Sequence, residues 1–331
     1  MKSRVKQALT ELKPDVVVVA GWADRVSLSV LKWSLAHRVP AVVMSESQAD
    51  DCRRNPITEW VKSKILESCS AGLVGGQTHR AYLESLGMRS DSIFLGYDAV
   101  DNDYFTRCVD EIRSSNIDFG VAHELPKKFF LATCRFIEKK NLIRLLEAYA
   151  EYAKSSVDSP WHLVLLGDGD LRATIECKIA ELQLSSMVHL PGFAQYSQIP
   201  KYYAAASALI HASTVEQWGL VVNEAMASRL PVLVSERCGS ARELIQPNIN
   251  GLIFNPLDVG AISDSMIQMA SMSESARKKI AEEGHRTIQA WGPGRFQLGL
   301  EDACGKAIQK GPSRGSLLSS FLLSLYSRIS N

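Results

Sequence analysis

The sequence predicts an α/β fold with two doubly wound domains, the first of them abbreviated. Short apolar, β-branched runs alternate with longer amphipathic segments almost from end to end of the 331 residues, which is the pattern of repeated βαβ units. One polar stretch, at about 101–126, interrupts the alternation and predicts the junction between the domains. With 46% hydrophobic and 22% charged residues, the chain has the composition and length of two globular domains.

The part before the junction begins with a helical pattern and then offers four predicted strands. These strands are short and apolar, as parallel strands covered on both faces are, and they lie at 15–20, 41–44, 72–75 and 93–96. Helical segments separate them at about 25–37, 56–68 and 77–86. Four strands are few for a doubly wound sheet, so we expect either an abbreviated domain or a chain that lacks the usual beginning.

The part after the junction contains six predicted strands, at 129–133, 162–166, 188–190, 208–211, 231–235 and 251–254. Five helical segments between them complete a doubly wound domain. The predicted organisation is a partial N-terminal domain at 1–118 and a complete domain at 119–292. At 293–331 we expect a helix that returns to the first domain, followed by a tail rich in serine and leucine.

Charge and cysteine content exclude several classes of protein. The 37 basic and 36 acidic side chains give a net charge of +1, which provides no field for a nucleic-acid backbone. Seven scattered cysteines without a Cys-x-x-Cys pair indicate reduced thiols rather than disulfides or a zinc site. The N-terminus lacks the apolar core of a signal peptide, and no apolar run approaches the roughly 20 residues of a membrane span. We therefore expect a cytoplasmic protein.

Ligands of open α/β sheets bind beyond the carboxyl ends of the strands, so the loops there are candidate sites. Arg135-Phe-Ile-Glu-Lys-Lys140 follows the strand at 129–133 and offers cations for a diphosphate; a solvated surface loop is the alternative. Gly167-Asp-Gly-Asp170 follows the next strand, and Gly167 and Gly169 allow close approach of the backbone to a ligand. Its two carboxylates suggest a helix N-cap, so no metal is predicted.

The most informative segment is Glu216-Gln-Trp-Gly-Leu-Val-Val-Asn-Glu224, which follows the strand at 208–211. If Gly219 and Leu220 begin a helix, their free backbone N–H groups and the positive end of the helix dipole form an anion site. Glu216 then lies on the preceding loop, and Glu224 lies about one and a half turns into the helix. The apolar Ala-Met-Ala after Glu224 indicates a buried carboxylate, which needs hydrogen-bond donors such as a ribose diol.

This combination resembles the retaining glycosyltransferases of family 4, which have the GT-B architecture of two Rossmann-like domains facing a cleft. The resemblance runs from about residue 14 to residue 308 and is strongest between 129 and 258. It rests on Arg135 and Lys140, Gly167-Asp-Gly, the Glu216/Glu224 pair, Pro231-Val-Leu-Val-Ser, Cys238-Gly, Glu243-Leu-Ile and Asn250-Gly-Leu-Ile-Phe-Asn-Pro. So many elements in one order make the match specific.

The resemblance implies a role for each matched residue. Arg135 and Lys140 would neutralise the diphosphate of a nucleotide-sugar donor, and Glu216 would bind hydroxyls of the transferred sugar. Glu224 would hold the ribose, and further donor contacts would come from Gly167, Gly169, Gly219, Leu220 and Val221. The implied reaction transfers the sugar to an acceptor hydroxyl with retention, without a metal and without a cofactor besides the donor substrate.

The chain departs from the family pattern in three places. Arg229 and Leu230 stand where a small residue is usual, which predicts an altered turn. Ser45-Glu46-Ser47 stands where the family often has a histidine, so Glu46 is a candidate for acceptor contact or acid–base work. About the first third of a typical N-terminal domain has no counterpart. A donor-binding but inactive truncated paralogue is therefore an alternative, as is a sugar-nucleotide epimerase or a phosphorylase on the same architecture.

The implied partners are a nucleotide sugar and a carbohydrate, lipid-linked or small-molecule acceptor. The tail carries Leu317, Leu318, Phe321, Leu322, Leu323, Leu325 and Tyr326 interleaved with serines. It is too short to span a bilayer but long enough for peripheral contact with a membrane. Packing on the protein or disorder is favoured, because interfacial anchors carry more basic residues than the single Arg328 found here.

Overall fold

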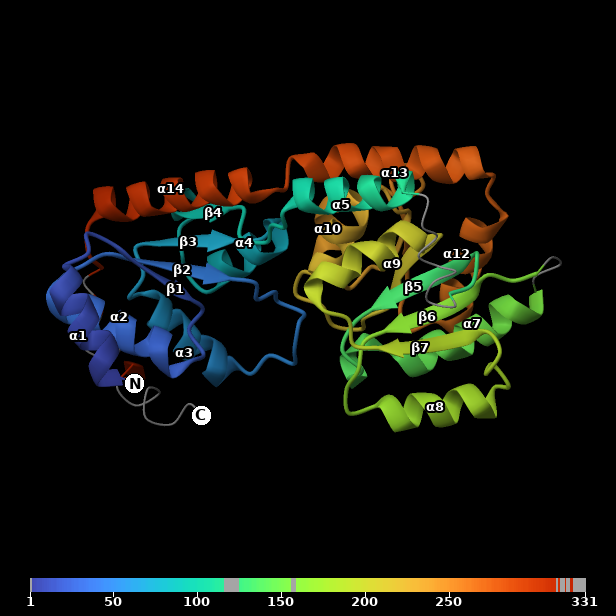
Figure 1. Cartoon of the computed structure of the whole chain (residues 1–331). Helices are drawn as coiled ribbons and strands as arrows, with labels where there is room; N and C mark the ends of the chain where they lie inside the picture. The colour runs from blue at the N-terminus through green and yellow to red at the C-terminus, as the bar shows by residue number, and fades with distance from the viewer. Residues whose placement is uncertain are drawn as a thin grey trace. The chain divides into compact units, whose positions relative to one another are not determined.

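The structure, a computed structural model, describes residues 2–115, 125–155, 159–313, 315, 319, 322 and 323 (Figure 1). The chain forms two compact units, Met1–Ala99 with Pro293–Asn331 and Val100–Gly292. Each unit contains one parallel sheet, which confirms the predicted α/β fold. None of the described helices is long and apolar enough to cross a membrane.

The first unit contains a four-stranded parallel sheet in the order β1-β2-β3-β4. Its strands are β1 (Val17–Ala20), β2 (Ala41–Ser45), β3 (Ala71–Val74) and β4 (Ile93–Leu95). Its helices are α1 (Lys2–Leu12), α2 (Arg25–His37), α3 (Pro56–Leu66), α4 (Gln77–Ser85), η1 (Ser90–Ser92) and α14 (Pro293–Lys310). The four predicted strands and the helices between them are present, with boundaries that differ by one or two residues.

Local sequence explains why these elements begin and pack where they do. The Asp24 carboxylate caps α2 by accepting hydrogen bonds from the backbone N–H groups of Val26 and Ser27, at 2.8 and 2.9 Å. Helix α14 covers β2, β3 and β4 (Figure 1). It does so closely at Gly299, where a Cβ atom would lie 2.1 Å from the carbonyl oxygen of Leu95. A residue without a side chain is therefore required at this contact.

The described part of the tail packs on the first unit. Leu322 and Leu323 are buried, and Leu323 belongs to the core formed by β1, β2 and the helices beside them. The Ser319 hydroxyl donates a hydrogen bond of 3.1 Å to the carboxylate of Glu67. Packing on the protein, the favoured interpretation, is confirmed for these residues. The other apolar tail residues named above, at 317, 318, 321, 325 and 326, lie outside the described residues.

The second unit contains a six-stranded parallel sheet in the order β10-β9-β8-β5-β6-β7. Its strands are β5 (Phe129–Thr133), β6 (His162–Leu166), β7 (Val188–Gly192), β8 (Ala208–His211), β9 (Val232–Ser235) and β10 (Leu252–Phe254). Its helices are α5 (Asn102–Ser114), η2 (Glu138–Lys140), α7 (Leu142–Ser155), α8 (Arg172–Glu181), η3 (Tyr196–Gln198), α9 (Ile199–Ala205), α10 (Leu220–Ala227), α11 (Gly239–Leu244), α12 (Val259–Ser271) and α13 (Glu274–Gln289).

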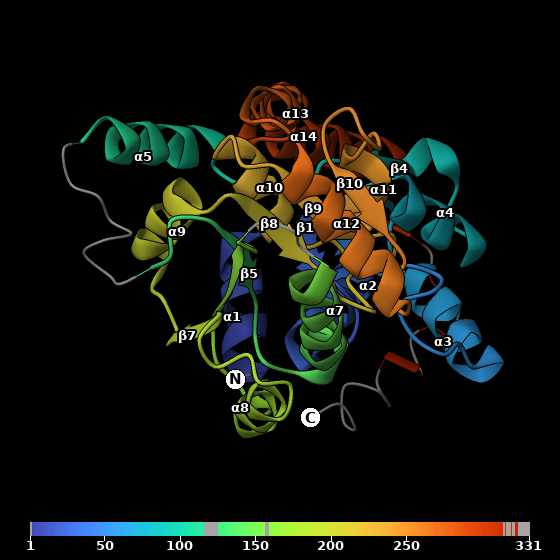
Figure 2. The same ribbon diagram turned by 90° about the vertical axis from the view of Figure 1, so that its right-hand side faces the viewer.

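Helices cover both faces of this sheet. Figure 2 shows α7 and α12 on one side of the strands and α9 and α10 on the other. Strand β5 pairs with β6 on one side and with β8 on the other. The winding of the chain therefore reverses between β5 and β8, and the crevice outside their carboxyl ends is where such sheets bind ligands.

One expectation about the junction is wrong. The polar stretch at 101–126, in which no apolar periodicity was identified, contains helix α5, and this helix packs in the second unit. Asp101 caps this helix by accepting a hydrogen bond of 2.9 Å from the Tyr104 N–H. The apolar side chains of Phe105 and Val109, four residues apart, are buried against the unit. Two buried positions among many charges are enough for one helix turn to face a core.

Candidate functional site

The loops that follow β5 and β8 are tied to each other at the point where the winding reverses. The Asn141 side-chain amide donates to the carbonyl oxygens of Ala212, at 3.1 Å, and Pro256, at 2.7 Å. The Thr214 N–H donates to the carbonyl oxygen of Lys139 at 2.9 Å. These bonds fix the cationic loop after β5 beside the loop that carries Glu216.

The structure places Lys140 and Glu216 in direct contact as an ion pair. The same carboxylate oxygen of Glu216, Oε2, lies 3.1 Å from His211 Nε2 and 3.2 Å from the Ser213 hydroxyl. Burial alone would raise the pKa of Glu216, but the hydrogen bond with His211 and the charge of Lys140 hold it well below its usual range. Glu216 is therefore a largely buried carboxylate that stays ionised, with 11% of its side chain exposed. Arg135 is exposed on the same loop as Lys140.

The backbone around Glu216 is held by the segment that follows β9. The Glu216 carbonyl oxygen accepts from the Gly239 N–H at 3.1 Å, and the Trp218 carbonyl oxygen accepts from the Ser240 N–H at 3.0 Å. The Cys238 thiol also donates to the Trp218 carbonyl oxygen, at 2.7 Å. The segment that follows β9 therefore fixes the backbone of this loop at Glu216 and at Trp218.

Helix α10 begins where the sequence predicts, with Gly219 as its N-cap and Leu220 and Val221 as its first residues. Gly219 has φ +94°, a conformation that favours glycine, and a Cβ there would lie 2.7 Å from the Cys238 sulfur. The N–H groups of the first turn of a helix have no partner within the helix, and they carry the positive end of its dipole. Helix N-termini of this kind are common binding sites for anions.

Glu224 lies inside α10, is 9% exposed, and accepts a hydrogen bond of 2.7 Å from the Tyr203 hydroxyl at Oε2. Burial raises the pKa of Glu224 to about 7, against the smaller effect of the Tyr203 hydrogen bond. The predicted burial of this carboxylate is thus confirmed. The other glutamate of the motif, Glu216, has the opposite shift because its partners are His211 and one cation, Lys140.

The two glycines of the turn after β6 serve a packing purpose that the sequence did not reveal. A Cβ on Gly167 would lie 1.9 Å from the Cys134 carbonyl oxygen, and one on Gly169 would lie 2.7 Å from the Phe136 carbonyl oxygen. The two glycines therefore allow the backbone of Cys134 and of Phe136, on either side of Arg135, to pack closely against this turn. The N-cap interpretation is wrong, because the cap of α8 is Leu171, and Asp168 accepts from the Gly169 N–H instead.

The first unit contains a second pair of acidic residues, at the carboxyl edge of its sheet. Glu46 follows β2, and Asp98 follows β4. Asp98 is 4% exposed, and its Oδ2 has no hydrogen bond to the described residues. Burial first, and then the charge of Glu46 and a hydrogen bond with it, raise the pKa of Asp98. A raised pKa favours the protonated form of Asp98, which can donate a hydrogen bond to Glu46.

A comparison with known protein families shows to which family the chain belongs. Residues 114–287, more than half of the chain, match the family described as Glycosyl transferases group 1. The chain belongs to this family. The resemblance inferred from the motifs is confirmed at this level, and the matched region contains Arg135, Lys140, Glu216 and Glu224.

Curated relatives of this chain align with it over part of their length. The alpha-monoglucosyldiacylglycerol synthase of Acholeplasma laidlawii is 29% identical over 126 residues, which cover 38% of this chain and 31% of that protein. The lipopolysaccharide core biosynthesis glycosyltransferase LpsE of Rhizobium meliloti is 29% identical over 154 residues, which cover 46% of this chain and 42% of that protein. The matched segment thus spans less than half the length of either relative.

Solved structures of glycosyltransferases show the same fold. HepE of Anabaena, in a crystal structure with UDP and glucose, superposes with a TM-score of 0.72 at 18% identity. The superposition covers 91% of this chain and 79% of that one. Sucrose-phosphate synthase of Thermosynechococcus elongatus superposes with a TM-score of 0.73 at 20% identity, covering 91% of this chain and 76% of that one. The predicted GT-B class of α/β fold is therefore confirmed.

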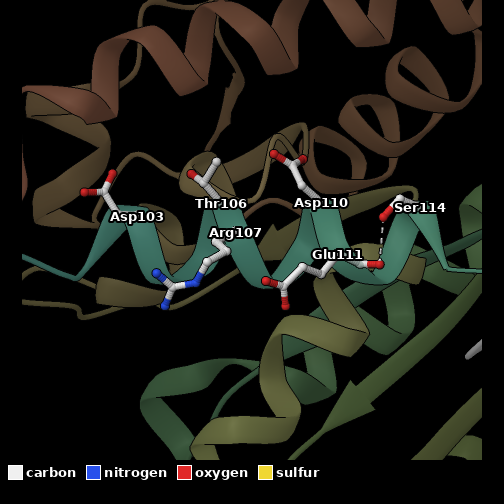
Figure 3. A pocket seen from close by; sticks show the side chains of 6 residues that line it. All are labelled: Asp103, Thr106, Arg107, Asp110, Glu111 and Ser114. Atoms are coloured by element: carbon white, nitrogen blue, oxygen red, sulfur yellow. Dashed lines mark hydrogen bonds between the residues drawn. The ribbon is translucent and has the colours of Figure 1, made fainter.

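A separate shallow hollow of about 650 Å³ lies along one face of α5 and does not include the residues around Glu216 (Figure 3). It is lined by Asp103, Thr106, Arg107, Asp110, Glu111 and Ser114. Three carboxylates against one guanidinium make it unsuited to a diphosphate. Within the described part of the chain, no group of three or more histidine, cysteine or acidic side chains is arranged to hold a metal ion.

Proposed function

We propose that this glycosyltransferase moves a sugar from a nucleoside diphosphate sugar to an acceptor hydroxyl, with retention of anomeric configuration. The observation that carries the proposal is the ionised Glu216 next to Lys140 and the N-terminus of α10. A carboxylate beside a cation and free N–H groups matches a ligand with hydroxyls on one side and phosphate on the other. Retention is proposed from the motifs shared with family 4.

Each part of the donor has a candidate partner. Lys140 and Arg135 would neutralise the diphosphate, and the N–H groups of Gly219, Leu220 and Val221 would bind its oxygens. Glu216 would accept hydrogen bonds from hydroxyls of the transferred sugar, and Glu224 would accept them from the ribose. Charge develops on the departing diphosphate as the glycosidic bond breaks, so fixed cations and helix N–H groups stabilise the transition state.

We propose that diphosphate departure needs no metal, because this chain supplies the positive charge itself through Arg135, Lys140 and the start of α10. Binding of UDP, measured by calorimetry, should be unchanged by excess EDTA. The measurement should be repeated with added Mg²⁺ to establish the comparison. A loss of binding in EDTA that Mg²⁺ restores would show that the charge has been assigned to the wrong groups.

We propose that the acceptor binds at the carboxyl edge of the first sheet, where Glu46 and Asp98 contact each other. A protonated Asp98 beside Glu46 would let the pair both donate and accept hydrogen bonds, which suits a hydroxyl group. The acceptor class remains a carbohydrate, a lipid-linked sugar or a small molecule. We propose a cytoplasmic location, with peripheral membrane contact in the case of a lipid-linked acceptor.

A donor screen tests the proposal. Thermal shift and hydrolysis are measured with UDP-, GDP-, ADP- and dTDP-sugars, and the anomeric configuration of any product is read by NMR. Glu216→Gln should abolish hydrolysis, whereas Glu138→Gln, an exposed glutamate near Lys140, serves as the matched control. Binding without hydrolysis or transfer would favour a donor-binding module, and isomerisation of the free donor would favour an epimerase.

A further inference from the structure

The Tyr203 side chain is a buried partner of Glu224 that comes from a different element. Tyr203 lies in α9, is 0% exposed, and is packed edge-on against Phe105 with ring centroids 5.9 Å apart. Its hydroxyl donates a hydrogen bond of 2.7 Å to Glu224 Oε2. Burial raises the pKa of Tyr203 well above its usual value, so its hydroxyl keeps its proton at neutral pH.

This contact gives the two oxygens of the Glu224 carboxyl different environments. Oε2 faces a permanent donor, and the described residues provide no hydrogen bond to Oε1. When the group is protonated, the proton sits on Oε1, because a donor already occupies Oε2. Oε1 can accept hydrogen bonds from two ligand hydroxyls only after this proton has left.

We propose that Tyr203 is a positioning residue that fixes Glu224 with Oε1 toward the ligand, so that binding of a nucleoside diphosphate releases the Glu224 proton to solvent. The inference rests on the proposed nucleotide-sugar site. The released proton is replaced by hydrogen bonds donated from the ribose hydroxyls to Oε1. Each protein molecule that was protonated at Glu224 therefore adds one proton to the solvent when it binds the ligand.

The protonation state of free Glu224 makes this coupling measurable. Burial raises the pKa of Glu224 to about 7, so a large fraction of the free protein carries the proton at neutral pH. Ligand affinity should then fall about tenfold for each pH unit below this value. Above it the affinity should reach a plateau.

The surroundings of α10 contain few other groups that titrate near Glu224. Tyr203 faces it from α9, and Tyr196 from η3 is close enough for the Glu224 charge to raise the Tyr196 pKa, after burial. His211 pairs with Glu216, and Asp101, Tyr104 and Cys108 lie near Tyr196. Five charged or titratable groups lie at the far end of the helix: Asp110, Arg113, Arg229, Glu282 and His285.

The test is UDP titration by calorimetry from pH 5.5 to 9, with GDP and ADP in parallel. Heats at pH 6.5 in buffers of different ionisation enthalpy give the number of protons released. Glu224→Gln gives the reference profile, which contains the ionisation of the ligand phosphate near pH 6. Tyr203→Phe removes the donor, and Tyr202→Phe makes the same change at the adjacent position, whose hydroxyl is not a partner of Glu224.

We expect a released proton in the wild type that is absent in Glu224→Gln. In Tyr203→Phe the midpoint of the affinity profile should rise by about one pH unit, since the Tyr203 bond lowers the Glu224 pKa. Tyr202→Phe should retain the wild-type midpoint. Equal weakening at every pH in Tyr203→Phe would make its role structural and overturn the inference.

Other outcomes are equally decisive. If the wild-type and Glu224→Gln profiles coincide, UDP binds without the proposed proton coupling, and only the further inference fails. If none of the three diphosphates binds at any pH, the nucleotide-sugar site itself is rejected. Should Tyr203→Phe fail to fold, the comparison of wild type with Glu224→Gln still decides the proton release.

Discussion

Replacement of Gly219 by alanine tests whether the N-cap of α10 shapes the site. Gly219 has φ +94°, and an added Cβ would lie 2.7 Å from the Cys238 sulfur and 3.2 Å from the Glu216 Cγ. The Cys238 side chain is fully buried and cannot move into solvent. The loop that carries Glu216 must therefore shift to make room, and the start of the helix must shift with it.

The magnitude follows from two separate costs. A side chain at positive φ costs about 1–3 kcal/mol of stability, and a methyl group forced into a packed site adds about 1–3 kcal/mol. Gly192 is a matched control, because it has φ +89° in the same unit but a Cβ there meets nothing within 4 Å. Gly219→Ala should therefore cost about 2–6 kcal/mol, whereas Gly192→Ala should cost only about 1–3 kcal/mol, from its positive φ. At about 2–4 °C per kcal/mol, Gly219→Ala should lower Tm clearly more.

Thermal melts and UDP affinity at pH 8 are the assays. Gly219→Ala should bind UDP weakly, whereas Gly192→Ala should bind it as the wild type does. Cys238→Ala removes the contacted sulfur, so the cost of Gly219→Ala should be smaller in that background, as a double-mutant cycle detects. Equal Tm losses for both glycines, with UDP affinity intact in both, would refute the assigned contact.

Two further predictions concern titratable pairs. At pH 8, Glu224→Gln should weaken the binding of both UDP and a UDP-sugar by about 1–3 kcal/mol, whereas Glu216→Gln should weaken only the binding of the UDP-sugar. Equal losses of affinity by calorimetry for both variants and both ligands would contradict these separate roles. His162 Nδ1 lies 2.9 Å from His189 Nε2, and burial lowers both pKa values below 6.5. Their neutral forms therefore stabilise the fold above pH 6.5. Urea melts should show that the free energy of unfolding decreases as pH falls through the lowered pKa values. This decrease should be less steep in the double variant His162→Gln/His189→Gln.

Strands were predictable because their signal is local. The bounds of β5, β6 and β8 agree with the apolar runs at 129–133, 162–166 and 208–211, since a buried parallel strand is a short run between polar loops. Helix α5 was missed for the converse reason. Its two buried apolar side chains, Phe105 and Val109, lie among charged residues, and this pattern becomes clear only when the packing partner is known.

The same distinction divides the candidate site. Gly219 and Leu220 were placed at a helix start from adjacent residues alone, and Glu224 was expected to be buried from the apolar residues beside it. The partners His211 and Tyr203 were not identified. His211 is only the last residue of a strand in the sequence, and Tyr203 lies 21 residues before Glu224. Contacts of this kind depend on the order of strands in the sheet, which brings α9 and β8 beside α10.

These unforeseen partners give the two glutamates of one motif different chemistry. Glu216 contacts Lys140, His211 and Ser213, and its pKa is lowered despite burial, so it stays ionised at neutral pH. Glu224 has a neutral hydroxyl as its partner, and burial raises its pKa to about 7. A permanent charge beside a cation suits steady binding of sugar hydroxyls near a diphosphate. A carboxyl group that is close to half protonated at neutral pH couples ligand binding to proton release. The spacing of the two glutamates identifies the motif, but residues outside the motif set the protonation state of each glutamate.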